Sequence, residues 1–214
     1  MKRPDYNLKI VLLAAGKSER FNGIKVLAKV QRQETSITLL EHALQQLFLA
    51  LKTLNISNKN IGVATGRYHQ QISELLDDPD LLYYCEAAHL GLGHTIAQSV
   101  EHMLNDAQDD ESSISHILIA LADQVALTAD DYIALIKQSL ALPNTLVCAK
   151  AGQEFMPPAI FPSVYFTDLM LLKGDKGAKS VLYTNKENLQ TVNLPHTEKD
   201  IDTQQDLADW YSNT

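Results

Sequence analysis

Small residues and cations gather in one stretch of the sequence, LLAAGKSERFNGIK, which continues from the apolar residues LKIV. The small residues are Ala14, Ala15 and Gly16, and their backbone amides can approach a ligand closely because almost no side chain covers them. Arg20 and Lys25 follow, the first a planar fork of N–H donors and the second a compact charge. The combination favours a phosphate-binding loop over a plain turn with solvated cations, although neither GxGxxG nor GxxxxGK[ST] is present.

Carboxylates that could hold a metal ion come after two other extended segments. Asp123 follows the apolar run HILIALA, so its side chain is expected just beyond the end of a buried strand. A helix N-cap is the alternative role, but Thr128 already provides a good cap for the helix that begins at Ala129. Asp200 and Asp202 lie two apart on one side of the segment DIDT, and we expect only one of them to reach a metal. Mg²⁺ binds one or two carboxylates together with phosphate oxygens, so these acids predict a Mg²⁺ cofactor.

The elements that must position these side chains are predicted by the apolar pattern. Short apolar runs alternate with longer amphipathic segments, as in βαβ units, which predicts an α/β, three-layer αβα, Rossmann-like fold with a mostly parallel mixed sheet. The expected strands are residues 8–14, 59–65, 81–86, 116–121, 145–150, 158–161 and 189–194. The expected helices are residues 36–54, 67–78, 94–106, 129–141, 163–172, 176–185 and 204–212. Ligands bind beyond the carboxyl ends of strands in such sheets, where the first loop and Asp123 fall.

Length and composition narrow the class of protein. A chain of 214 residues without an internal repeat predicts a single domain over residues 1–214. The net charge of −8 argues against non-specific binding to nucleic acid or an anionic membrane, and no apolar stretch approaches the roughly 18 residues of a membrane span. Cys85 and Cys148 lack metal-ligand spacing and are expected to be buried, reduced thiols. We therefore expect a cytoplasmic protein that binds neither nucleic acid nor a membrane.

Five segments, in order, resemble the signatures of the MobA-like NTP transferases, a nucleotidyltransferase family that includes molybdenum cofactor cytidylyltransferase. LLAAGKSERFNGIK is similar to the family's LAAGxSxRMGxxK. GLGHTIAQSV is similar to a glycine-containing helix entry of the family, and LIALADQVALT is similar to its LADQP. LKGDKGAKSVL is similar to its GDKGAR, and DIDTQQDLADW is similar to its DIDTPEDL. Together they cover the chain nearly end to end, so the chain is identified as a member of this family, with a nucleotidyltransferase fold.

The resemblance implies a role for each candidate residue. It makes Arg20 and Lys25 the catalytic cations, and Asp123 and Asp202 the ligands of Mg²⁺. It assigns nucleotide binding to the first loop and the helix entry, at Ala14, Ala15, Gly16, Gly91, Gly93 and Thr95. The alternative for GLGHT is an ordinary glycine-rich helix entry. Lys176 and Lys179, at the start of a late helix, could hold an acceptor phosphate or form an exposed basic face.

The resemblance also implies the substrates. Relatives with AAG in the first loop tend to use CTP and those with AGG tend to use GTP, so AAG here favours CTP. The implied reaction moves CMP from CTP to the terminal phosphate of molybdopterin and releases pyrophosphate, with a molybdo-hydroxylase or its maturation chaperone as partner. Two alternatives stay open: transfer to a sugar phosphate or other small phosphate, and a non-catalytic nucleotide-binding partner of a molybdoenzyme.

Several residues depart from the family's pattern. Asn22 stands in place of the usual glycine, and Val125 and Gln204 each stand in place of a proline. The segment GQEFMPPAIF falls where relatives tend to carry a glycine and a histidine or asparagine before a proline. Because that region is associated with the acceptor in the family, these changes bear on the acceptor more than on the nucleotide.

Overall fold

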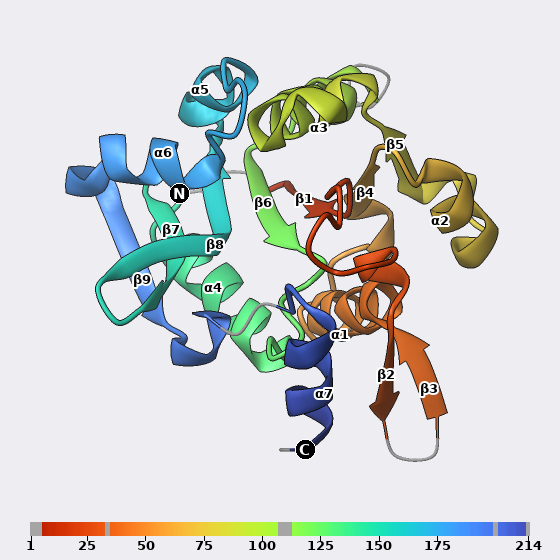
Figure 1. The fold of residues 1–214 in the computed structure, drawn as a ribbon. Helices are drawn as coiled ribbons and strands as arrows, with labels where there is room; N and C mark the ends of the chain where they lie inside the picture. Colours follow the sequence, from red (N-terminus) through yellow and green to blue (C-terminus); the bar gives the residue numbers. More distant parts are fainter. Residues whose placement is uncertain (1–5, 33–34, 107–112, 199–200, 213–214) are drawn as a thin grey trace.

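The computed structural model describes residues 6–32, 35–106, 113–198 and 201–212, and a seven-stranded sheet lies at its centre (Figure 1). The strand order is β5-β4-β1-β6-β8-β7-β9. The strands are β1 (Leu8–Leu13), β4 (Ile61–Thr65), β5 (Leu82–Tyr84), β6 (His116–Leu121), β7 (Leu146–Ala151), β8 (Glu154–Pro162) and β9 (Leu189–Asn193). Neighbouring strands are parallel except at β8, which runs antiparallel to β6 and β7. The predicted mostly parallel mixed sheet is confirmed.

Helices cover both faces of this sheet, because both faces are apolar. The helices are α1 (Leu39–Thr53), α2 (His69–Leu76), α3 (Leu92–Asp106), α4 (Ala129–Ala141), α5 (Phe166–Met170), α6 (Ala178–Thr184) and α7 (Gln204–Ser212). On one face α1 and α4 pack through residues such as Leu47 and Leu135. On the other, α3 and α5 pack through residues such as Ile96 and Leu169, with α6 beside them (Figure 1). The three-layer αβα fold is therefore confirmed.

Short 3-10 turns connect several elements. They lie at Lys25–Leu27, Asn58–Asn60, Pro79–Leu81, Glu86–Leu90, Ser163–Tyr165, Lys186–Asn188 and Pro195–Glu198. The predicted helix over 163–172 is wrong in length, because its first residues form one of these turns and only Phe166–Met170 is α-helical. Most other predicted elements are present with their ends shifted by a few residues, and the helices over 129–141 and 204–212 match the prediction.

A β-hairpin replaces the first turn of the helix predicted over 36–54. The strands β2 (Lys29–Arg32) and β3 (Thr35–Thr38) pair antiparallel, and α1 begins only at Leu39. Thr38 ends the strand and caps the helix: its hydroxyl accepts from Glu41 N at 3.1 Å, and the Glu41 carboxylate accepts from Thr38 N at 2.7 Å. This reciprocal cap, together with the β-branched residues of TSIT, explains why the helix begins later than predicted.

Strand β8 is longer than the predicted 158–161, because two prolines inside it are accommodated by a bulge. Cys148 of β7 pairs with Ala159, whereas the next residue, Ala149, pairs with Met156. The residues left over in β8 are Pro157 and Pro158, which cannot donate to the ladder and therefore sit where no backbone donor is required.

Two further expectations concern burial. Cys85 and Cys148 are buried and unpaired, as predicted. Across the part of the chain that the structure describes, no helix combines the length and the apolar character that crossing a bilayer requires.

Candidate active site

A cavity of about 520 Å³ lies at the carboxyl ends of β1 and β6, the edge of the sheet where the sequence predicts a ligand site. The last residues of the two strands, Leu13 and Leu121, pair in the sheet and both line the cavity. Every predicted site residue except Gly93 lines it as well. The fold therefore gathers at one edge residues that are far apart in the sequence.

Lys25 lies between the two predicted metal-ligand carboxylates. Its Nζ donates to Asp123 Oδ2 at 2.5 Å and to Asp202 Oδ1 at 3.0 Å. Asp202 Oδ2 also accepts from Arg20 Nη2 at 2.7 Å. We call these four residues, Arg20, Lys25, Asp123 and Asp202, the charged cluster. The side chain of Lys25 is 14% exposed and that of Arg20 is 73% exposed. Of the two cations, Lys25 is therefore the buried one.

Burial and the neighbouring carboxylates act on the pKa of Lys25 in opposite directions. Burial lowers the pKa, because the charged ammonium loses hydration. The charge of Asp123 and the hydrogen bonds to both carboxylates raise it, and the net result is a pKa above the usual value for lysine. Lys25 therefore stays protonated at neutral pH and brings a permanent positive charge into the cavity.

The loop after β1 is folded back so that Lys25 reaches the end of the strand. Ser18 has a left-handed φ of 54°, and its hydroxyl accepts from Lys25 N at 3.0 Å. Phe21, which is 2% exposed, anchors the loop in a small apolar cluster with Val125. Asn22 has a φ of 52°, a conformation that asparagine tolerates better than most residues. The loop can thus keep its shape without the family's glycine at this position.

The other two departures from the family's pattern contact the same loop. Val125 is buried against Phe21, and the Gln204 side-chain amide donates to Phe21 O at 3.1 Å. Both residues therefore support the loop that carries Lys25.

Asp202 is brought to the cluster by the segment before α7. Ile201 N donates to Asp123 O at 3.2 Å, and the Ile201 side chain is buried with Phe21. These contacts join the segment to the end of β6 and place Asp202 beside Lys25. Asp200, the alternative metal ligand, lies outside the described residues.

The N-terminal cap of α7 holds Asp202 from the other side. Thr203 Oγ1 accepts from Asp206 N at 3.1 Å, and the Asp206 carboxylate accepts from the backbone N of Thr203 and of Asp202 at 2.7 and 2.9 Å. These hydrogen bonds lower the pKa of Asp206 below its ordinary value, so it is ionised at neutral pH. The orientation of Asp202 thus depends on a short charged cap.

The two carboxylates of the cluster have the capacity to hold a divalent cation. Asp123 Oδ1 is buried and accepts no hydrogen bond from the described residues. Among those residues no three His, Cys, Asp or Glu side chains converge, so the protein offers two carboxylates rather than a closed cage. Such a partial shell, completed by phosphate oxygens, suits Mg²⁺. Thr128 is the N-cap of α4, as predicted, so Asp123 is not needed as a cap.

Glycines at the start of α3 allow the segment 173–176 to approach. Gly91 lines the cavity with a φ of +123°, and a Cβ there would lie 2.4 Å from the backbone carbonyl of Gly174. Gly93 is not among the residues that line the cavity. A Cβ at Gly93 would lie 2.7 Å from the backbone of Lys173, and Gly93 N donates to Gly174 O at 2.7 Å. Gly93 therefore packs closely against the segment 173–176, and its role in nucleotide binding stays a prediction. Thr95 is buried, and its hydroxyl donates to Gly91 O at 3.4 Å.

Two glycine substitutions should separate packing from ligand binding. Gly16→Ala adds a methyl group that meets nothing within 4 Å, so the thermal midpoint should stay unchanged while the nucleotide KM rises because the cavity loses space. Gly91→Ala puts a methyl group against the Gly174 backbone in a strained conformation, so it should cost roughly 2 kcal/mol or more of stability. Thermal melts and steady-state kinetics of both variants test this; equal melting losses would contradict it.

The lysines considered for an acceptor phosphate do not line the cavity. Lys179 Nζ donates to Glu154 Oε2 at 2.5 Å, and the same oxygen accepts from Tyr183 OH at 3.0 Å. The rings of Tyr183 and Phe155 lie 5.1 Å apart. Lys179 thus belongs to an exposed cluster on β8 and α6, and Lys176 lies on the exposed segment before α6.

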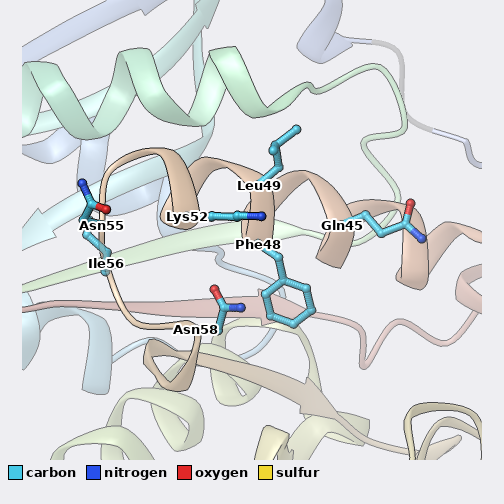
Figure 2. Close-up of a pocket in the computed structure, with 7 residues that line it drawn as sticks. All are labelled: Gln45, Phe48, Leu49, Lys52, Asn55, Ile56 and Asn58. Carbon is cyan, nitrogen blue, oxygen red and sulfur yellow. The ribbon is translucent and has the colours of Figure 1, made fainter.

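A larger hollow of about 610 Å³ lies along α1 and the turn before β4 (Figure 2). It is lined by Gln45, Phe48, Leu49, Lys52, Asn55, Ile56 and Asn58. Because this turn precedes β4, the hollow lies toward the amino ends of the strands, away from the charged cluster. Among the described residues, its lining includes one cation, Lys52, and no carboxylate, so no metal ligand of that kind is found there.

Asp175 is a charged residue of the cavity that the sequence motifs did not single out. Asp175 lines the cavity, and its Oδ1 lies 2.7 Å from the position that a Gly91 Cβ would take. It lies inside the segment LKGDKGAKSVL, which matched the family without directing attention to its aspartate.

Comparison with known proteins shows the family of this chain. A family model described as the MobA-like NTP transferase domain matches residues 10–191. Purine catabolism protein PucB of Bacillus subtilis (strain 168) is 30% identical over 176 residues, which cover 80% of this chain and 78% of that protein.

Solved structures share the fold. Rv0371c of Mycobacterium tuberculosis superposes with a TM-score of 0.73 at 18% identity, covering 98% of this chain and 100% of that one. A further structure of Rv0371c is a complex with manganese, with a TM-score of 0.71 at 17% identity and the same coverage. Molybdopterin-guanine dinucleotide biosynthesis protein A of Archaeoglobus fulgidus superposes with a TM-score of 0.61 at 12% identity, covering 96% and 97%.

The family match extends from β1 into β9 and so includes the loop of Arg20 and Lys25, the helix entry at Gly91 and the aspartate after β6. A relative at 30% identity over most of both chains agrees with it. The chain therefore belongs to the MobA-like NTP transferase family, and it is a nucleotidyltransferase.

Proposed function

We propose that this nucleotidyltransferase transfers CMP from CTP to the terminal phosphate of molybdopterin and releases pyrophosphate. The observation that carries the proposal is the charged cluster in a cavity at the carboxyl ends of β1 and β6. The choice of CTP rests on AAG in the first loop, a feature of relatives that tend to use CTP. The choice of molybdopterin rests on the family resemblance.

The reaction needs positive charge more than it needs a base. An oxygen of the acceptor phosphate attacks the α-phosphorus of CTP, and a new O–P bond forms. The bond from the α-phosphorus to the bridging oxygen breaks, and pyrophosphate leaves with the electron pair. Because the attacking phosphate is already anionic at neutral pH, no general base has to remove a proton. Positioning and charge stabilisation then provide most of the acceleration.

Lys25 and Arg20 have donors left for phosphate oxygens. A lysine ammonium has three N–H groups, and Lys25 uses two of them on Asp123 and Asp202. We assign the third to a non-bridging oxygen of the α-phosphate, where negative charge develops. Arg20 has five N–H groups, and one hydrogen bond joins it to Asp202. Its exposed guanidinium can place the remaining donors on the β- and γ-phosphates as a fork.

Asp123 and Asp202 are the residues that would hold Mg²⁺. The free lone pairs of Asp123 Oδ1 and the pair of carboxylates fit a hard cation that takes part of its shell from phosphates. A bound Mg²⁺ would neutralise phosphate charge in the cavity. The manganese complex of Rv0371c, a protein of the same fold, is consistent with a divalent cation.

Two classes of acceptor have to be distinguished, molybdopterin and a sugar phosphate. Lys25 would assist transfer to any phosphate, so a sugar phosphate remains the alternative acceptor. We favour molybdopterin because of the five matched motifs, and because an archaeal protein of the same fold is named for molybdopterin-guanine dinucleotide biosynthesis. A molybdo-hydroxylase or its maturation chaperone would then receive the product. The non-catalytic alternative is set aside, since the chain belongs to an enzyme family.

Nucleotide choice provides the test. With Mg²⁺ and molybdopterin present, CTP should give a kcat/KM roughly tenfold or more above that of GTP, because the pocket would have to reject a larger base. Pyrophosphate release is measured with CTP, UTP, ATP and GTP in turn. Omitting molybdopterin, or replacing it with glucose 1-phosphate, should abolish the signal. A preference for GTP would show that the loop misled the assignment, and turnover with the sugar phosphate alone would favour the competitor.

A further inference from the structure

The walls of the cavity differ in charge. The loop after β1 supplies its lysines and arginine, namely Lys17, Arg20 and Lys25, together with one carboxylate, that of Glu19. A second set of lining residues comes from the turn before α3, the start of α3 and the segment before α6, and among the described residues this set includes no cation. This second wall includes Leu92, which is 41% exposed, and the carboxylate of Asp175. Phosphates are attracted to the first wall, so the uncharged nucleoside is left to contact the second.

The carboxylate of Asp175 is unpaired among the described residues. Its carboxylate makes no hydrogen bond or ion pair with any residue in the described ranges. The lysines on either side of it in the segment, Lys173 and Lys176, are exposed and do not line the cavity. Among the described residues of this wall, Asp175 therefore has the one polar side chain without an internal partner, and a carboxylate accepts hydrogen bonds only from N–H or O–H groups.

The segment that carries Asp175 is held firmly against α3. Gly93 N donates to Gly174 O at 2.7 Å, and Gly174 N donates to His94 Nδ1 at 3.0 Å. The missing side chain of Gly91 leaves the space in which Gly174 and Asp175 lie. His94, Gly91 and Gly93 thus support the backbone at Asp175, so this part of the chain does not have to be ordered when a ligand binds.

We propose that Asp175 is a nucleotide-binding residue that accepts a hydrogen bond from the nucleoside part of the substrate. The donor is either the exocyclic amino group of the base or a ribose hydroxyl, which present the same chemistry to a carboxylate. This inference deepens the proposed function and rests on it, because it takes CTP as the nucleotide.

The sign of the effect distinguishes this role from simple electrostatics. A nucleoside triphosphate is strongly anionic, so removing a carboxylate from its cavity should tighten binding if only long-range charge matters. If Asp175 accepts a hydrogen bond from the nucleoside, the same substitution should weaken binding, by about tenfold or more for a charged acceptor. The two explanations predict changes in opposite directions.

The experiment is calorimetric binding of CTP at fixed Mg²⁺, without acceptor, to the wild type and to Asp175→Ala and Asp175→Asn. Asp175→Ala should weaken CTP binding about tenfold or more, and Asp175→Asn should lose less because its amide oxygen still accepts. Asp168→Ala removes an exposed carboxylate from α5, outside the cavity lining, and should leave the affinity unchanged. Thermal melts of all variants should match the wild type, because the Asp175 side chain holds nothing in place.

Further nucleotides identify the donor. If the amino group is the donor, the loss seen with Asp175→Ala should disappear for UTP, which has a carbonyl at that position. If a ribose hydroxyl is the donor, CTP and UTP should lose equally, and the loss should disappear for 2′-deoxy-CTP or 3′-deoxy-CTP. Unchanged or tighter binding of CTP by Asp175→Ala would overturn the inference. A wild type that binds no nucleoside triphosphate would instead overturn the proposed function, so the two failures are distinguishable.

Discussion

Lys25→Ala should lower turnover by roughly 10²-fold or more while the protein stays folded. The substitution removes the permanent charge that we place on the α-phosphate, where the transition state gains negative charge. It also leaves Asp123 and Asp202 facing each other without the cation between them. Because Lys25 no longer competes for the carboxylates, metal affinity should be retained or increased. Lost turnover with retained metal binding would mark Lys25 as a catalytic residue rather than a metal-site support.

A second cavity variant and a control variant accompany this test. Arg20→Ala should cause a loss of the same order, since its fork would bind the leaving phosphates. Lys52→Ala removes an equal charge from the hollow on α1 and should leave turnover unchanged. Pyrophosphate release under saturating CTP, with circular dichroism to check folding, provides the measurement. Near-wild-type turnover for both cavity variants would refute the proposed phosphate site.

Asp123→Asn should raise the Mg²⁺ concentration needed for half-maximal activity by about tenfold or more, with partial recovery at high Mg²⁺. Asparagine keeps the size of the side chain but removes one negative charge from the shell of the ion. Removing a residue that only hydrogen-bonds a metal ligand commonly lowers metal affinity 10–100-fold. Removing a ligand itself should lower the affinity at least as much. Asp202→Asn should act in the same direction, since both carboxylates face Lys25.

A direct binding measurement separates this prediction from general loss of activity. Titration of Mn²⁺ followed by electron paramagnetic resonance, in the presence of CTP, reports the affinity without turnover. Asp130→Asn, an exposed carboxylate on α4 outside the cavity lining, serves as the charge control and should bind Mn²⁺ like the wild type. If Asp123→Asn keeps wild-type dependence on the metal, Asp123 is not a ligand.

The sequence alone was sufficient for the elements and residues that depend on local pattern. The short apolar runs predicted all seven strands of the central sheet. Inner strands such as β1 and β4 are apolar nearly throughout because both of their faces are buried, whereas the edge strands β5 and β9 are partly exposed. Thr128 was recognisable as a cap because its role depends on the residues beside it in the chain. The strands β2 and β3 were not predicted, since they lie between the loop motif that ends at Lys25 and the amphipathic pattern of α1. Their pairing depends on a neighbouring strand rather than on a pattern within either one. Strand β8 was underestimated, because its prolines usually exclude a central strand unless a bulge receives them.

Only the tertiary structure decided how the site residues meet. No local pattern could place Lys25 between Asp123 and Asp202, because that arrangement depends on β1 pairing with β6 and on Ile201 bonding to Asp123 O. The same is true of the close contact between Gly93 and the segment 173–176, which no motif indicates. Asp175 became a site residue only once that segment was seen against α3. Contacts between distant segments result from packing summed over the whole sheet, whereas a motif records only neighbours along the chain.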